Sequence, residues 1–192
     1  MAIFGSASEG FSRANINATI EESLARFAPV ASAAVEAGLP VRGYVSCVVE
    51  CPYDGPVAPG AVANVAARLR DLGCYEISLG DTIGRARPEA TDAMLSAVLG
   101  EVPSAALAGH FHDTSGQALA NVDVALARGL RVFDSAVGGL GGCPYAPGAA
   151  GNVATEALHQ HLTAAGYATG LDADILSDAA RLAAGMRSGD IA

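Results

Sequence analysis

Short apolar runs alternate with amphipathic stretches along the whole chain. Five runs rich in aliphatic and β-branched residues have the length and composition of buried strands. They lie at residues 2–4, 41–48, 75–79, 105–108 and 131–137. Elsewhere apolar residues recur at helical spacing, which predicts helices at residues 17–37, 60–72, 88–100, 116–127, 152–165 and 172–185. The pattern predicts strand followed by helix five times, and then one further helix.

Local signals support the predicted helix ends. Thr19 and Glu22 have the spacing of a capping box, and Gly38 is expected to end the same helix. Pro88 suits the first turn of a later helix, where its missing N–H costs nothing.

The repeat predicts an α/β fold with parallel strands joined by crossover helices. A doubly wound sheet and a (β/α)8 TIM-type barrel both have this order. Polar groups follow several different strands, and a barrel gathers all strand ends around one mouth, so we expect the barrel type. A complete barrel needs eight strands and about 250 residues. We therefore expect a partial barrel of about five βα units, forming a single domain over residues 1–192.

Composition and charge narrow the function classes. Hydrophobic residues make up 51% of the chain and mean hydropathy is +0.34, which indicates a well-buried core. The net charge of −9 argues against a nucleic-acid or anionic-membrane surface. No apolar run approaches the ~20 residues that span a bilayer, and no basic leader begins the chain, so we expect a cytoplasmic protein. The four cysteines are expected to be reduced, and Cys47 and Cys74 to be packing residues.

All 11 basic residues are arginine, and lysine is absent. A Schiff-base aldolase needs a lysine amine. Any carbon–carbon chemistry in this chain must therefore use a metal or another electron sink.

Two histidines follow the fourth apolar run. Side chains alternate along a strand, so His110 and His112 are expected to share one face, where they could bind one divalent metal ion. The alternative is two unrelated polar residues at a strand end. His159 and His161 have the same spacing but lie in a predicted helix. A two-residue step there turns about 200°, so we expect this pair to be an ordinary surface feature.

Four other polar residues are candidates for a site. Cys143 lies in the glycine-rich loop of residues 138–151, where a thiol could reach a substrate and exchange a proton, or could be incidental to a connector. Asn152 is either the N-cap of the next helix or an oxygen ligand for a hard cation. Asp81 could be a base, an orienting group or a helix cap. Asn15 could contact a ligand or form a turn.

Several of these stretches together resemble the hydroxymethylglutaryl-CoA lyase family over about residues 3–171. The matching motifs are Val-Arg-Gly-Tyr-Val-Ser-Cys at 41–47, Cys-Tyr-Glu-Ile-Ser-Leu-Gly-Asp-Thr-Ile-Gly at 74–84, His-Phe-His-Asp-Thr at 110–114 and Gly-Leu-Gly-Gly-Cys-Pro-Tyr-Ala at 139–146. The His-x-His-Asp motif is shared with isopropylmalate and homocitrate synthases, whereas the cysteine loop is more specific to the lyase.

The resemblance implies a dimeric barrel with Mg²⁺ or Mn²⁺ at its mouth that cleaves 3-hydroxy-3-methylglutaryl-CoA into acetyl-CoA and acetoacetate, a reaction of leucine degradation. It implies that His110, His112 and Asn152 are metal ligands. It also implies that Cys143 protonates the acetyl-CoA enolate and that Asp81 lies near the substrate hydroxyl. Further expected substrate-binding residues are Asn15, Tyr44 and Ser78.

One family feature has no counterpart here. The family carries an Arg-Asp pair on its first strand, whereas the first strand of this chain corresponds to about the fourth, and Arg70-Asp71 lies in a predicted helix. We expect the metal to keep three of four protein ligands, and the chain to act as a homo-oligomer or with a complementing N-terminal segment. The alternatives are a truncated homologue that binds metal or a partner without catalysis, and a related acyl-CoA condensing synthase.

Overall fold

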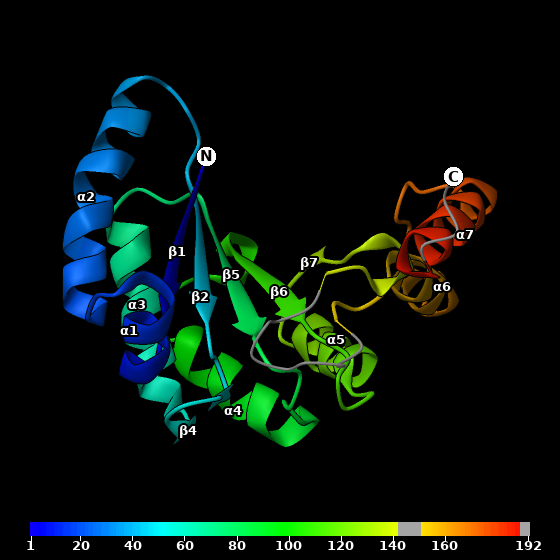
Figure 1. Cartoon of the computed structure of the whole chain (residues 1–192), viewed down its shortest axis with the longest axis horizontal. Coiled ribbons are helices and arrows are strands. Elements are labelled where there is room, and N and C mark those ends of the chain that lie inside the picture. Colours follow the sequence, from blue (N-terminus) through cyan, green and yellow to red (C-terminus); the bar gives the residue numbers. More distant parts are fainter. Residues whose placement is uncertain (142–150, 189–192) are drawn as a thin grey trace.

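The computed structural model describes residues 1–141 and 151–188 and shows a five-stranded parallel sheet with helices packed along it (Figure 1). The strands are β1 (Ala2–Ser6), β2 (Arg42–Ser46), β5 (Glu76–Asp81), β6 (Leu107–Phe111) and β7 (Val132–Asp134). They pair in chain order, β1-β2-β5-β6-β7, without a reversal. A doubly wound sheet reverses its strand order at a switch point, so the consecutive order is that of an arc of a barrel.

Helices connect the strands and extend beyond the last one. They are α1 (Glu9–Ile16), α2 (Ile20–Glu36), α3 (Pro59–Asp71), α4 (Pro88–Val98), α5 (Ala118–Ala127), α6 (Thr155–Ala164) and α7 (Ala173–Ser188), with 3₁₀ turns at Ser104–Ala106 and Val137–Gly139. Figure 1 shows α6 and α7 beyond β7, at the opposite end of the arc from α2. No helix within residues 1–141 and 151–188 has both the length and the apolar character needed to cross a membrane.

The first helical region differs from the prediction. Thr19 and Glu22 do form the capping box: Glu22 N donates to Thr19 Oγ1 at 3.0 Å and Thr19 N donates to Glu22 Oε2 at 2.8 Å. However, a separate helix, α1, precedes it and was missed. Ser8 caps α1 by accepting a hydrogen bond from Phe11 N. Asn15 therefore lies in a helix, not in the connection expected from the sequence.

Alternate strand positions separate two faces of the sheet. The face toward the helices carries the core, including Ile3, Val45, Ile77, Leu79 and Leu107, each at most 5% exposed. The opposite face, called the inner face below, leaves Phe4 46% and Val132 39% exposed. This open inner face carries the polar residues of the candidate site.

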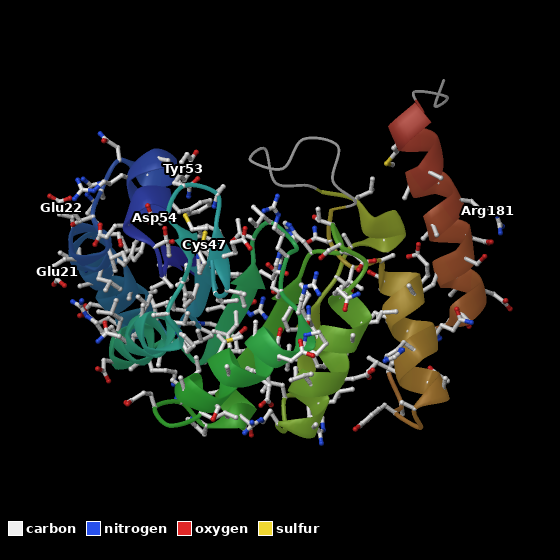
Figure 2. The ribbon with its side chains drawn as sticks, turned by 90° about the horizontal axis from the view of Figure 1, so that it is seen from below. Glu21, Glu22, Cys47, Tyr53, Asp54 and Arg181 are labelled. Carbon is white, nitrogen blue, oxygen red and sulfur yellow. The ribbon has the colours of Figure 1, made fainter. Side chains whose placement is uncertain are left out.

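A small hairpin that the sequence did not predict follows β2. It pairs β3 (Glu50–Cys51) with β4 (Gly55–Pro56). Cys47 and Cys51 form a buried cluster with Phe11. The backbone N–H groups of Tyr53 and Asp54, labelled in Figure 2, donate to Cys51 Sγ at 3.3 Å.

Two cysteines were expected to be packing residues, and both are buried. Burial raises the pKa of Cys47 to about 12 and that of Cys74 to about 11. Their thiols therefore stay protonated at neutral pH and pack in the core.

Candidate active site

The predicted pairing of His110 and His112 on one side of a strand end is present in the structure. His110 is the fourth residue of β6, in register with Gly80 of β5, and His112 follows directly after the strand. Their ring centroids are 5.3 Å apart and the rings are tilted by 50°. Two imidazoles at this separation can bind one divalent cation.

Asn152 joins this pair through the backbone. His112 and Asn152 form an antiparallel bridge, and Val153 N donates to Phe111 O at 3.0 Å. Helix α6 begins only at Thr155, with Ala154 as its N-cap, so Asn152 is not the helix cap that the sequence left open.

The Asn152 carboxamide has an unused acceptor. Its Nδ2 donates to Leu140 O at 3.0 Å, whereas its Oδ1 is buried and accepts no hydrogen bond. Burying an amide oxygen without a partner is costly. An oxygen held this way beside two imidazoles suits a divalent cation, so the residues present fit the metal implied by the resemblance.

Within the described residues, no group of three or more His, Cys, Asp or Glu side chains could hold a metal ion. The candidate site instead combines two histidines with a carboxamide. It could supply three protein ligands.

Glycines allow the ends of the long loop to meet beside the site. Asn152 N donates to Gly141 O at 3.2 Å, and Asp113 N donates to Gly151 O at 2.8 Å. Gly151 has a φ of 82°, and a Cβ there would lie 2.1 Å from Gly141 O. Only glycine fits this contact. Cys143 lies between these two loop ends in the sequence and falls outside the described residues.

A carboxylate that the sequence analysis did not select lies directly beside His110. Asp134, the last residue of β7, places Oδ2 3.1 Å from His110 Nδ1 and accepts from Ser78 Oγ on the same oxygen at 2.7 Å. Its Oδ1 accepts from Arg42 Nη1 at 2.8 Å. Burial opposes ionisation, but the hydrogen bonds from His110, Ser78 and Arg42 outweigh it and lower the pKa of Asp134 to about 2.

Arg42, on β2, holds this network from the same face of the sheet. Its Nε donates to Glu76 Oε1 at 2.6 Å, Nη1 also donates to the Tyr44 hydroxyl, and the guanidinium lies 4.9 Å from the Tyr44 ring centroid. Burial alone would lower the pKa of Arg42, but its hydrogen bonds to Asp134 and Glu76 raise it. The sequence did contain a signal that could have identified Arg42, Glu76 and Asp134. Each is a charged residue within an otherwise mostly apolar strand, at a position that faces the inner side of the sheet.

The electrostatic surroundings of His112 favour its neutral form. Burial and the neighbouring His110 lower its pKa, while the Thr82 backbone opposes the shift. Neutral imidazole is the form that binds a metal.

Side chains alternate along β5, so Asp81 lies on the helix-facing side of the sheet while its neighbour Gly80 lies on the inner face. It is 1% exposed, and its two carboxylate oxygens accept from Arg85 N at 3.2 Å and Ala86 N at 2.9 Å. Burial raises the pKa of Asp81 to about 6. These contacts organise the loop before α4, but the N-cap of α4 is Arg87, so Asp81 is not the cap of that helix.

The three expected substrate-binding residues lie in different settings. Tyr44 is on the inner face, and its ring meets His110 edge-on at 6.5 Å. Ser78 is fully buried and donates its hydroxyl to Asp134. Asn15 is exposed in the last turn of α1. The structure therefore brings Tyr44 and Ser78, but not Asn15, into contact with the network around His110.

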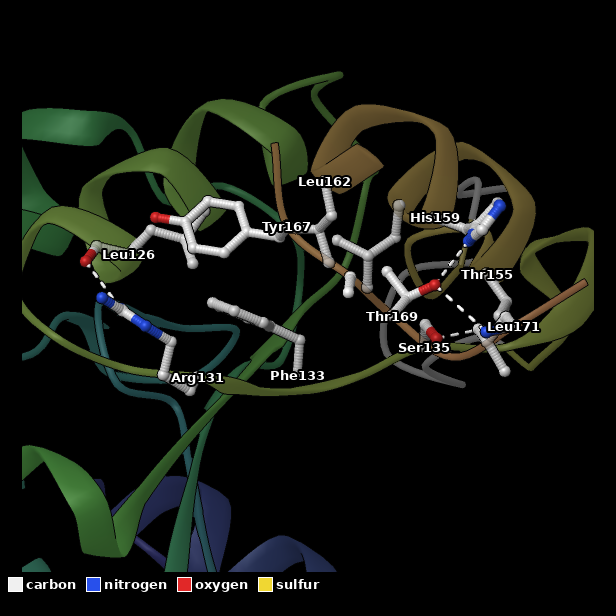
Figure 3. A pocket seen from close by; sticks show the side chains of 12 residues that line it. Leu126, Arg131, Phe133, Ser135, Thr155, His159, Leu162, Tyr167, Thr169 and Leu171 are labelled. Carbon is white, nitrogen blue, oxygen red and sulfur yellow. Dashed lines mark hydrogen bonds between the residues drawn. The ribbon is translucent and has the colours of Figure 1, made fainter. Parts of the chain in front are cut away.

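The second His-x-His pair lies on α6, as expected. His161 Nε2 is 2.6 Å from Asp123 Oδ1, and His159 Nδ1 is 2.7 Å from Thr169 Oγ1. His159 lines a pocket of about 360 Å³ together with residues of β7 and α6. Figure 3 shows the side chains that line this pocket. Because His110, His112 and Asn152 do not line it, this pocket is separate from the candidate site.

Sequence comparison agrees with this arrangement. The HMGL-like family model matches residues 1–183. This chain belongs to the HMGL-like family. The resemblance predicted from the motifs, and the barrel-type fold with it, are confirmed.

Individual relatives show how much of the family protein is represented. The chain is 60% identical over 177 residues to the hydroxymethylglutaryl-CoA lyase of Pseudomonas mevalonii, covering 92% of this chain and 59% of that protein. The crystal structure of HMG-CoA lyase from Brucella melitensis superimposes with a TM-score of 0.96 at 60% identity, over 97% of this chain and 66% of that chain. The chain thus spans about three fifths of these relatives.

A second family structure was solved with ligands. It is an HMG-CoA lyase from Acinetobacter baumannii in complex with coenzyme A and 3-methylmalate. It matches with a TM-score of 0.87 at 36% identity, over 94% of this chain and 59% of that chain.

Proposed function

We propose that this chain carries the metal-binding part of a lyase that cleaves 3-hydroxy-3-methylglutaryl-CoA to acetyl-CoA and acetoacetate. The observation that carries the proposal is the convergence of His110, His112 and the unpartnered Asn152 Oδ1 at one strand end. Family membership supports the reaction, because relatives at 60% identity bear the lyase name.

The three ligands would hold Mg²⁺ or Mn²⁺. A divalent cation bound there would polarise substrate oxygens and make the tertiary hydroxyl easier to ionise, as a retro-Claisen cleavage requires. The neutral imidazole of His112 and the carboxamide of Asn152 add no negative charge, so the cation would keep its full effect on the substrate.

Other residues would bind the substrate and move protons. We assign Cys143 as the acid that protonates the departing acetyl-CoA carbanion, because its loop begins and ends at Gly141 and Gly151 beside the metal ligands. Tyr44, Ser78 and Asn15 are the proposed substrate-binding residues. Asp81 is proposed to act near the substrate hydroxyl by holding the loop that precedes α4.

The open inner face supports a partner in addition to an acyl-CoA substrate. Phe4 and Val132 expose apolar surface on the edge strands β1 and β7, and such edges favour association. We propose that a complementing N-terminal segment or a second copy covers this face. Named relatives include cytoplasmic and mitochondrial proteins, and we propose a cytoplasmic location.

The direct test is an acetoacetate assay with hydroxymethylglutaryl-CoA and Mg²⁺. The purified chain is measured alone and after co-expression with the amino-terminal part of the Pseudomonas mevalonii enzyme. We expect cleavage in the complemented sample, loss of cleavage in His112→Gln, and retention in the matched control His161→Gln. Absence of cleavage in a complemented sample that is folded and binds Mn²⁺ would remove the lyase assignment.

A further inference from the structure

The carboxylate of Asp134 makes a directed contact with one nitrogen of His110. Its Oδ2 lies 3.1 Å from His110 Nδ1, and its two oxygens also accept hydrogen bonds from Arg42 and Ser78, so the group acts as a hydrogen-bond acceptor. The hydrogen between the two atoms must therefore belong to Nδ1. In a neutral imidazole the other nitrogen, Nε2, is then left with a free lone pair.

The carboxylate is fixed in this orientation from both ends. Arg42 Nη1 occupies Oδ1 at 2.8 Å, and Ser78 Oγ shares Oδ2 with His110 at 2.7 Å. Arg42 is itself held by Glu76 at 2.6 Å. Asp134 thus cannot rotate away from His110 without breaking hydrogen bonds on an inner face where its side chain is only 22% exposed.

We infer that Asp134 is a positioning residue that holds His110 in the Nδ1–H tautomer and directs its free Nε2 toward the cation. This inference deepens the proposed function and rests on its metal site. Partners of this kind fix the orientation of metal-binding histidines, and their loss typically weakens metal affinity about 10- to 100-fold.

The chain contains an opposite case that serves as a control. His161 contacts Asp123 through Nε2 at 2.6 Å, on the exposed side of α6. Asp123 should therefore hold His161 in the Nε2–H tautomer. The same carboxylate–imidazole pairing thus fixes opposite tautomers at the two positions.

The test is ¹⁵N NMR of the imidazole nitrogens in the full chain at pH 8, where only four histidines contribute signals. Wild-type His110 should show a protonated Nδ1, and His161 a protonated Nε2. In Asp134→Asn, Arg42 should retain the amide oxygen, so the amide NH₂ would face His110 and favour its Nε2–H tautomer. Asp123→Asn should change His161 alone, and Ser78→Ala should leave the His110 tautomer intact.

Mn²⁺ affinity, measured by electron paramagnetic resonance of the free ion, gives the second readout. Asp134→Asn should weaken binding about 10- to 100-fold, and Asp123→Asn should leave it unchanged. A wild-type His110 protonated on Nε2 overturns the inference without any variant, as does Asp134→Asn with unchanged tautomer and affinity. If Mn²⁺ broadens no signal of His110 or His112 in the wild type, the metal site of the proposed function fails even when the tautomer result stands.

Discussion

Replacing Arg42 by methionine tests whether the network beneath the site stabilises the fold. Methionine keeps much of the apolar stem and removes the guanidinium that bonds to Asp134 and Glu76. Those two carboxylates are 22% and 12% exposed and would lose their cationic partner. We therefore expect Arg42→Met to be strongly destabilising.

Two estimates set the magnitude. The pKa of Asp134 falls from 3.8 to about 2 in the folded state. At about 1.4 kcal/mol per tenfold change in acidity, that fall corresponds to about 2 kcal/mol of stability. Removing one partner of a fully buried ion pair costs about 3–5 kcal/mol. Because these side chains keep some exposure, we expect a loss of about 2–4 kcal/mol and a melting temperature about 5–12 °C lower.

The assay is urea unfolding followed by circular dichroism at pH 7 and along the acid limb. Because the folded-state pKa of Asp134 lies below its unfolded value, its stabilisation is present above pH 4 and is lost as the pH falls through about 2. Arg42→Met should flatten this part of the pH profile. The matched control is Arg128→Met, which breaks a two-pronged contact with Asp92 on the surface and should cost much less. Equal unfolding midpoints for the two variants, or an unchanged acid limb, would refute the reasoning.

Three further results are expected. Gly151→Ala would place a Cβ 2.1 Å from Gly141 O and should abolish Mn²⁺ binding. The control Gly166→Ala also lies at positive φ, but its Cβ would meet no atom within 4 Å, so it should retain Mn²⁺ binding. Normal Mn²⁺ binding by both variants would contradict the loop geometry. Burial raises the pKa of Asp81 to about 6, so this group should lower the free energy of unfolding by about 2 kcal/mol as the pH rises from 4 to 7. In Asp81→Asn, this pH-dependent loss should be absent from the urea unfolding midpoints. If the difference in midpoint between wild type and Asp81→Asn is the same at pH 4 and pH 7, the raised pKa of Asp81 is disproved. Mn²⁺ at a hundred times its dissociation constant should stabilise the chain by about 2.7 kcal/mol, and adding EDTA should reverse this gain. If Mn²⁺ leaves the melting temperature unchanged, the native state does not bind the ion.

Part of the candidate site could be predicted because it depends on short-range regularities. His110 and His112 share a side because a strand alternates every two residues. The capping box of Thr19 and Glu22 is likewise a three-residue relation, and it is present in the structure. The missed helix α1 is short and polar, and its cap at Ser8 was the only strong local signal.

The remaining site depends on which strands lie side by side. Arg42 and Asp134 are 92 residues apart in the chain and meet only because the sheet curves β2 toward β7. The position of Asn152 is of the same kind, since local sequence left an N-cap and an oxygen ligand equally open, and in the structure Asn152 bridges to His112 while Ala154 is the N-cap.

The sequence by itself determined the alternation of strands and helices, the paired histidines and the family motifs, since each is written in residues a few positions apart. Only the tertiary structure decided that Asp134 faces His110 Nδ1, that Arg42 holds Asp134, and that Asn152 Oδ1 is left without a donor. The physical reason is that hydrogen-bond partners across a sheet are selected by strand register and curvature, which no single stretch of the chain encodes.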